Sequence, residues 1–145
     1  MNSKKAKTPR ADEACPECGK PLRARQATLK YPVNGEEIAV ERCEHSKCAA
    51  CGEIVLRLDQ ARMLRERAHA SYRARHELLS PSEIRALRER FGMTQVEFAA
   101  VLRLGGNTLS RWEAGRNVQS AAMDMLLRLI RDVPGSVEYL RRHVA

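Results

Sequence analysis

Long apolar segments and aromatic side chains are scarce in this sequence. No run of about eighteen apolar residues occurs, which excludes a transmembrane helix. Aromatic residues make up only 4% of the 145 residues, so a large aromatic core is not expected. The opening stretch MNSKKAKTPRADEA has basic residues but no apolar segment after them. We therefore expect no secretory signal and a cytoplasmic protein.

Acidic residues are in deficit. Lys and Arg together number 26 against 18 Asp and Glu, which gives a net charge of +8. Arginine, which forms forked contacts with phosphates and guanine edges, far outnumbers lysine. The charge favours a polyanionic partner such as nucleic acid or an anionic membrane surface, and solubility alone is the alternative explanation.

Glycine and proline are missing from one internal stretch, and this absence helps to divide the chain. Residues 1–13 are expected to be a disordered basic tail, and residues 14–55 contain all five cysteines. Residues 56–79 lack both glycine and proline and predict a charged linker helix. Residues 80–145 show helical patterning throughout and predict an all-α, five-helix domain.

Two cysteine pairs share the C-x-x-C-G spacing: Cys15 with Cys18, and Cys48 with Cys51. In a reducing compartment this pattern indicates metal binding before disulfides, and four thiolates on two knuckles predict one tetrahedral Zn²⁺ ion per chain. Four thiolates complete the coordination shell, so the ion is expected to be structural rather than catalytic. A rubredoxin-type iron site uses similar ligands and remains an alternative.

The sequence CEHSKC leaves the ligand set open at one point, because Cys43 or His45 can replace a ligand. The symmetry of the two C-x-x-C-G segments favours the set given above. We therefore expect Cys43 to be partly buried and His45 to face solvent in a loop.

Strand-like segments lie between the cysteine pairs. Residues 26–31 and 37–42 flank Asn34-Gly35, a hairpin turn signal. The cysteine region is therefore predicted to be a small zinc-ribbon-like α+β domain, stabilised by a metal because its core is small.

Capping residues mark the helix boundaries after residue 79. Ser80-Pro81-Ser82-Glu83 and Thr94-Gln95-Val96-Glu97 both match the capping box, and Gly92 follows the first predicted helix. A third helix is expected over residues 106–114. Ser120 can cap a fourth helix, and a short fifth helix closes the domain.

The stretch GGNTLSRWEAG at residues 105–115 contains the only tryptophan. Helical spacing places Leu109 and Trp112 on one face, so Trp112 is expected in the core rather than against a base. Small or forked hydrogen-bonding residues occupy the opposite stripe: Gly106, Asn107, Ser110 and Arg111. Asn pairs with adenine and Arg with guanine, each discriminating by about 1–3 kcal/mol.

This stripe predicts a DNA-reading surface, with an ordinary exposed polar face as the alternative. Asn107 and Arg111 are expected to read bases, with Thr108 and Ser110 assisting. The backbone at Gly106 is expected to approach a phosphate. Further phosphate contacts are expected from three side chains: Gln95, Arg103 and Arg116.

The segment GMTQVEFAAVLRLGGNTLSRWEAGR resembles the helix-turn-helix of Xre/Cro-type repressors, which have a TQxxFA opening and a T-[LIV]-S-R-W-E recognition helix. This resemblance covers residues 80–133. Arg103 occupies the turn position that usually holds glycine. The order of CPxCG, CxxCG, linker helix and this motif resembles MqsA-family antitoxins with a YgiT-type zinc finger, over residues 15–140.

The resemblance implies a DNA-binding transcriptional repressor, the antitoxin of a type II toxin–antitoxin system. An enzyme, such as a zinc-ribbon nuclease accessory, is a rival that the residues disfavour, because they offer no paired carboxylates, no nucleophile–base arrangement and no phosphate-cradling loop. Family members bind operator DNA as homodimers through the C-terminal domain and a ribonuclease toxin through the N-terminal zinc domain. Their base contacts correspond to Asn107 and Arg111. We expect dimerisation through apolar residues of the last two helices: Leu126, Ile130, Val137 and Leu140. The alternative is a stand-alone Xre-type regulator without a toxin, whose zinc domain senses a signal or docks a partner.

Overall fold

The computed structural model describes residues 13–144, which fall into two compact units. The first unit contains the residues up to Tyr31 and Ala39–Arg65, and the second contains Pro32–Ile38 and the chain from Glu66 onward. The expected basic tail of residues 1–13 lies, apart from its last residue, outside the described range. Among the described residues, no helix has the length and apolar character needed to cross a membrane.

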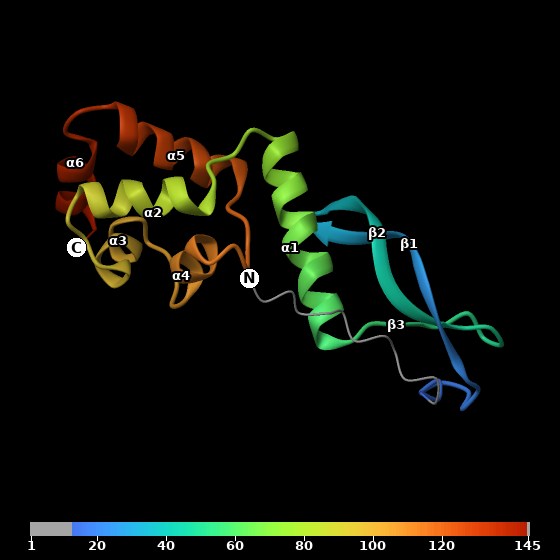
Figure 1. Cartoon of the computed structure of the whole chain (residues 1–145). Helices are drawn as coiled ribbons and strands as arrows, with labels where there is room; N and C mark the ends of the chain where they lie inside the picture. Colours follow the sequence, from blue (N-terminus) through green and yellow to red (C-terminus); the bar gives the residue numbers. More distant parts are fainter. Residues whose placement is uncertain (1–12, 145) are drawn as a thin grey trace, which may run out of the picture. The chain divides into compact units, whose positions relative to one another are not determined.

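A three-stranded sheet with strand order β1-β2-β3 forms most of the N-terminal region (Figure 1). Its strands are β1 (Leu22–Val33), β2 (Glu36–Cys48) and β3 (Ile54–Val55). β3 pairs antiparallel with β2, with Ser46 opposite Val55. β1 and β2 meet at Asn34 and Gly35, whose φ angles of 47° and 82° suit the tight turn between twisted strands.

Helix α1 (Leu58–Arg75) lies within the residues expected to form a linker helix. Leu64, Ala68 and Tyr72 recur every four residues and are buried, which gives the helix one apolar stripe. The helix ends where Glu77 adopts the left-handed conformation, with a φ of 51°. The amide of Leu78 then donates to the carbonyl of Arg73 at 3.0 Å, a Schellman-type ending.

Five helices follow α1 (Figure 1): α2 (Pro81–Arg90), α3 (Gln95–Val101), α4 (Thr108–Glu113), α5 (Ala121–Asp132) and α6 (Ser136–His143). Both predicted capping boxes are confirmed. The Ser80 hydroxyl accepts from the Glu83 amide at 3.2 Å, and Thr94 accepts from Glu97 at 3.2 Å. The Ser120 side chain caps α5 as expected, by accepting from the amide of Met123.

One apolar core joins these five helices, and Leu109 and Trp112 of α4 are both buried in it. The prediction that the indole faces inward is therefore confirmed. Ile130 and Val137 are also core residues. Leu126 and Leu140 are partly buried and pack against the same core.

Ile130 and Val137 are thus buried within the fold of one chain, so the prediction that these two residues form a dimer interface was wrong. Leu126 and Leu140 are half-buried, and their place in an interface stays a prediction. α5 has more apolar residues than one face can hold. The residues that remain exposed are Met125, Leu129 and Val133. They follow one another at intervals of four, so Met125 and Leu129 form a second apolar stripe on α5, which Val133 continues at the C-cap.

Candidate metal centre and nucleic-acid interface

The four predicted cysteine ligands come together at one point of the first unit. Their Sγ atoms all lie within 4.8 Å of one another. The Sγ atoms of Cys15 and Cys51 are 3.6 Å apart, and those of Cys18 and Cys48 are 3.5 Å apart. A tetrahedral zinc site with bonds of about 2.3 Å requires sulfur–sulfur separations of about 3.8 Å. The cluster therefore fits a metal ion of this size.

Two similar turns position the sulfurs. The amide of Gly19 donates to the carbonyl of Cys15 at 2.8 Å, and the amide of Gly52 donates to the carbonyl of Cys48 at 3.0 Å. Gly19 and Gly52 have φ angles of 72° and 81°, which side chains with a Cβ rarely adopt. The glycine after each C-x-x-C pair is thus explained by the backbone of the turn.

The backbone also tunes the acidity of the sulfurs. Hydrogen bonds from the amides of Cys51 and Ala50 lower the pKa of the Cys48 thiol to about 6. The amide of Glu53 lowers the pKa of Cys51, but burial and the neighbouring sulfurs outweigh it and raise that pKa to about 12. Four thiolates this close repel one another, so a bound cation is needed to hold all of them charged.

Cys43 and His45 lie apart from the cluster, on β2. The Cys43 thiol donates to the carbonyl of Val40 at 3.1 Å, and Nδ1 of His45 lies 3.0 Å from the carbonyl oxygen of Cys43. Both residues are buried. The expectation that His45 faces solvent in a loop was therefore wrong, because β2 extends further toward Cys48 than its sequence pattern indicated.

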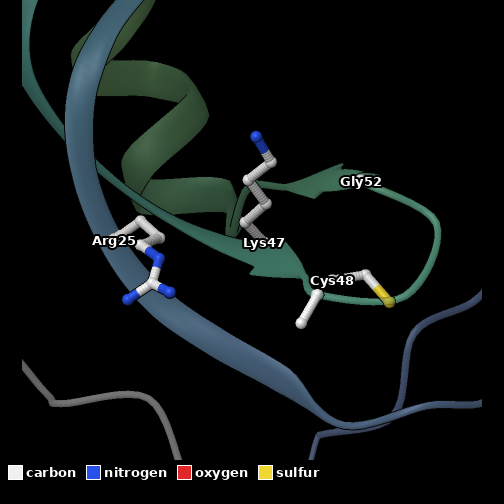
Figure 2. A pocket seen from close by; sticks show the side chains of 5 residues that line it. Arg25, Lys47, Cys48 and Gly52 are labelled. Atoms are coloured by element: carbon white, nitrogen blue, oxygen red, sulfur yellow. The ribbon is translucent and has the colours of Figure 1, made fainter.

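A basic pocket of about 360 Å³ adjoins one knuckle of the cluster. Figure 2 shows Arg25 on β1 and Lys47 on β2 at this pocket, with Cys48 at the end of β2 and Gly52 on the turn that follows. Two cationic side chains thus lie beside the cysteines on this surface.

The predicted DNA-reading stripe lies at the surface of the second unit. Asn107, which directly precedes α4, and Arg111 within α4 are exposed, whereas Thr108 and Ser110 are half-buried. The Ser110 hydroxyl donates to the carbonyl of Asn107 at 2.9 Å, so it also stabilises the first turn. α4 is shorter than the predicted helix over residues 106–114.

The turn before α4 departs from the usual glycine. Arg103 adopts the left-handed conformation with a φ of 53°, and its Nη2 donates to the carbonyl of His143 at 2.7 Å. This conformation is uncommon for a residue with a Cβ. Gly106, with a φ of 25°, is exposed, as is Arg116.

The side chain of Gln95 belongs to a network that the sequence reasoning missed. Gln95 Nε2 donates to Glu113 Oε2 at 2.9 Å. Arg88 contacts the same carboxylate through Nε at 2.6 Å and Nη2 at 3.0 Å, and its Nη1 donates to the carbonyl of Met93. Burial raises the pKa of Glu113, but the hydrogen bonds from Arg88 and Gln95 outweigh it and hold the pKa below its ordinary value. These bonds join α2, α3 and α4.

Comparison with known families covers both regions at once. Residues 13–141 match the family described as the antitoxin component of a bacterial toxin–antitoxin system, MqsA. This chain belongs to the MqsA antitoxin family. The match includes both the cysteine cluster and the helices that carry Asn107 and Arg111.

This MqsA-family chain is also similar to an antitoxin that is named differently. The chain is 36% identical over 62 residues to the antitoxin HigA-2 of Vibrio cholerae serotype O1. The aligned segment makes up 43% of this chain and 60% of that relative, so less than two thirds of the relative is covered. The chain is thus similar to two antitoxin groups.

The missed network has a recognisable signal in the sequence. Glu113 follows Trp112 directly and lies four residues after the buried Leu109, so it sits at the edge of the inward face of α4. An acidic residue at that edge needs a cationic partner, which here is Arg88. The partner itself could not be identified without knowing how α2 packs against α4.

Proposed function

We propose that this MqsA-family antitoxin is a sequence-specific DNA-binding repressor that regulates its own operon and neutralises a ribonuclease toxin, without catalytic activity of its own. The proposal of DNA binding rests on the division of side chains at α4 into an exposed polar set and a buried apolar set. Asn107 and Arg111 are exposed, while Leu109 and Trp112 fix the helix to the core. A short helix held in this way can enter the major groove of duplex DNA.

Base recognition follows from the chemistry of the exposed pair. The amide of Asn107 can form two hydrogen bonds with adenine, and the guanidinium of Arg111 can form two with guanine. Each such pair contributes discrimination of about 1–3 kcal/mol. Thr108 and Ser110 are proposed to assist, and Gly106 lets the backbone come near a phosphate because it lacks a Cβ.

Phosphate contacts are proposed to supply much of the affinity. Their candidates are Gln95, Arg103 and Arg116. The side chain of Gln95 donates to Glu113, and the side chain of Arg103 donates to the carbonyl of His143. Each keeps further polar atoms for a phosphate. Binding is therefore expected to weaken steeply as the salt concentration rises.

A homodimer through the C-terminal region is part of the proposal. The exposed stripe of Met125 and Leu129 on α5 and Val133 at its C-cap supports it, because apolar residues grouped on one face lose water contact when two copies associate. A two-fold dimer would read two half-sites about 34–36 Å apart, one turn of the DNA helix.

The N-terminal region, residues 14–55, is proposed to be a structural zinc domain that binds the toxin. Cys15, Cys18, Cys48 and Cys51 would hold the ion, which when bound supplies folding energy to a region with a small core. The basic pocket at Arg25 and Lys47 supports a contact with an acidic surface of a partner. Residues 56–79 would link this domain to the helix-turn-helix and dimerisation domain of residues 80–145.

Base reading is tested with the variant Arg111→Ala. The probe is a duplex from the region upstream of the gene for this chain, compared with a scrambled duplex of the same composition. We expect the preference for the upstream duplex to fall by about ten- to one-hundredfold, equivalent to about 1–3 kcal/mol. Arg62→Ala, which removes an exposed arginine from α1, is the control for loss of charge. An unchanged footprint for Arg111→Ala would refute the role given to α4.

Toxin neutralisation is tested by co-expressing the chain with the product of the neighbouring gene. A toxic neighbour whose effect on growth is relieved by the full chain supports an antitoxin. A neighbour without toxicity, combined with specific DNA binding, would favour a stand-alone regulator.

A further inference from the structure

The segment 115–119, which follows Ala114 at the end of α4, receives hydrogen bonds from side chains far away in the sequence. Nδ1 of His69 lies 3.3 Å from the carbonyl oxygen of Gly115, and Nη2 of Arg73 donates to the carbonyl of Asn117 at 2.5 Å. Both donors are on α1. Asn34, at the turn between β1 and β2, donates through Nδ2 to the carbonyl of Gln119 at 3.2 Å. Three carbonyls of one short loop are therefore held from outside the helix-turn-helix.

Arg73 is buried in making this contact. Only 8% of Arg73 and 5% of His69 are exposed. Burial lowers the pKa of the Arg73 guanidinium, since a charged group loses water contact there. Placing this charge inside the protein is costly unless it makes good hydrogen bonds. Arg73 is also too buried to be a phosphate ligand itself, so its effect on DNA must pass through the loop.

The inner side of the loop is fixed as well. Gln119 is fully buried, and its Nε2 donates to the carbonyl of Leu79 at 2.8 Å and to Asp124 Oδ1 at 3.0 Å. Val118 is buried too, whereas Arg116 and Asn117 are exposed. The loop thus presents two polar residues to solvent from a backbone anchored on both sides.

The same loop contacts the proposed base-reading residue. The amides of Arg116 and Asn117 both point to the carbonyl of Arg111, at 2.8 Å and 3.3 Å. A displacement of the loop would therefore move the end of α4. Because α4 is only six residues long, it has few internal hydrogen bonds to resist such a displacement.

We propose that Arg73, His69 and Asn34 are positioning residues for operator recognition. They hold segment 115–119 so that Arg116 and Arg111 meet the DNA in one preformed geometry, which reduces the ordering cost of binding. This inference rests on the proposed DNA-binding function. It implies that residues 80–145 alone recognise the operator less well than the full chain does.

The test compares Arg73→Gln with Arg62→Gln in the full chain, using the upstream and scrambled duplexes described above. Both variants lose one positive charge from α1, so non-specific binding to the scrambled duplex is expected to fall equally in both. We expect only Arg73→Gln to reduce the preference for the upstream duplex, by about tenfold. Arg73→Lys is expected to restore much of it, because an ammonium group can donate to the carbonyl of Asn117.

Asn34→Gly provides a second, milder perturbation. Asn34 has a φ of 47°, which glycine adopts without strain, so this variant removes only the side-chain donor to Gln119. We expect the preference for the upstream duplex to fall by about two- to fivefold. This variant decides the question if circular dichroism shows that Arg73→Gln has lost its helices.

Hydrogen exchange of the amides of Arg116 and Asn117 is measured in the same proteins. We expect faster exchange in Arg73→Gln than in Arg62→Gln. Equal preference for the upstream duplex and equal exchange in the two variants would overturn the positioning role. If the wild-type chain shows no preference between the duplexes, the proposed function fails, and the exchange rates alone decide whether Arg73 holds the loop.

Discussion

Replacing Glu113 with glutamine tests what holds the three helices of the proposed DNA-binding motif together. The carboxylate of Glu113 accepts two hydrogen bonds from Arg88 of α2 and one from Gln95 of α3. Glutamine has nearly the same shape but only one oxygen, and its NH₂ group faces donors that need an acceptor. The substitution therefore removes the charge and part of the bonding without leaving a cavity.

The expected loss of stability follows from burial. Only 4% of the Glu113 side chain and 12% of the Arg88 side chain are exposed. Breaking a buried ion pair from one side costs about 3–5 kcal/mol. Arg88 keeps its bond to the carbonyl of Met93 and a second carboxylate, Glu89, at 3.8 Å. One oxygen also remains in the variant, so we expect Glu113→Gln to lower the free energy of unfolding by about 2 kcal/mol.

Urea denaturation followed by circular dichroism measures this free energy. The control is Glu89→Gln, which removes the same charge from a side chain that is 53% exposed and pairs with Arg85 one turn away. Exposed pairs of this kind contribute at most about 0.5 kcal/mol. Equal destabilisation of the two variants would show that the Arg88–Glu113 pair does not fasten α4, and the reasoning would be refuted.

Three further predictions concern acidity, association and metal. Burial raises the pKa of Asp124, but hydrogen bonds, chiefly from Arg128, outweigh it and hold the pKa below the ordinary 3.8. The ionised Asp124 carboxylate therefore stabilises the fold above that pH, and this stabilisation is lost as the pH falls through the folded-state pKa. Acid unfolding of Asp124→Asn should accordingly depend less on pH below about 4 than that of the wild type. Leu129→Glu should yield monomers by light scattering, and a variant that remains dimeric would exclude the α5 stripe as the interface. Removing zinc with a chelator should unfold residues 14–55 and leave residues 80–145 helical, whereas loss of the entire helical circular dichroism signal would contradict that independence.

Local signals in the sequence predicted the parts of the structure that depend on neighbouring residues. The capping boxes at Ser80 and Thr94 form as expected, because each is closed within four residues. The inward position of Trp112 follows from helical spacing alone. The four cysteines were identifiable because their spacing reflects the geometry of the turns that carry them.

Features that depend on distant partners could not be predicted in the same way. α5 has apolar residues on two stripes, and only its packing against the other helices decides that Ile130 is buried and Leu129 exposed. The bond between Arg73 and the carbonyl of Asn117 joins residues 44 apart in the sequence. Arginine on a predicted charged helix gives no sign of such a partner, because most arginines there remain in solvent.

The boundary of the proposed DNA-binding unit follows from these distant contacts. A six-residue helix is too short to be stable alone, so neighbouring residues must fix its position. Glu113 fixes the end of α4 through its bonds to α2 and α3. Segment 115–119, beyond that end, is bonded in turn to α1 and to the turn between β1 and β2. The compact unit that contains α4 accordingly consists of the chain from Glu66 onward together with the earlier segment Pro32–Ile38. We therefore infer that the smallest piece with full operator affinity extends beyond the helix-turn-helix that the sequence motif outlines.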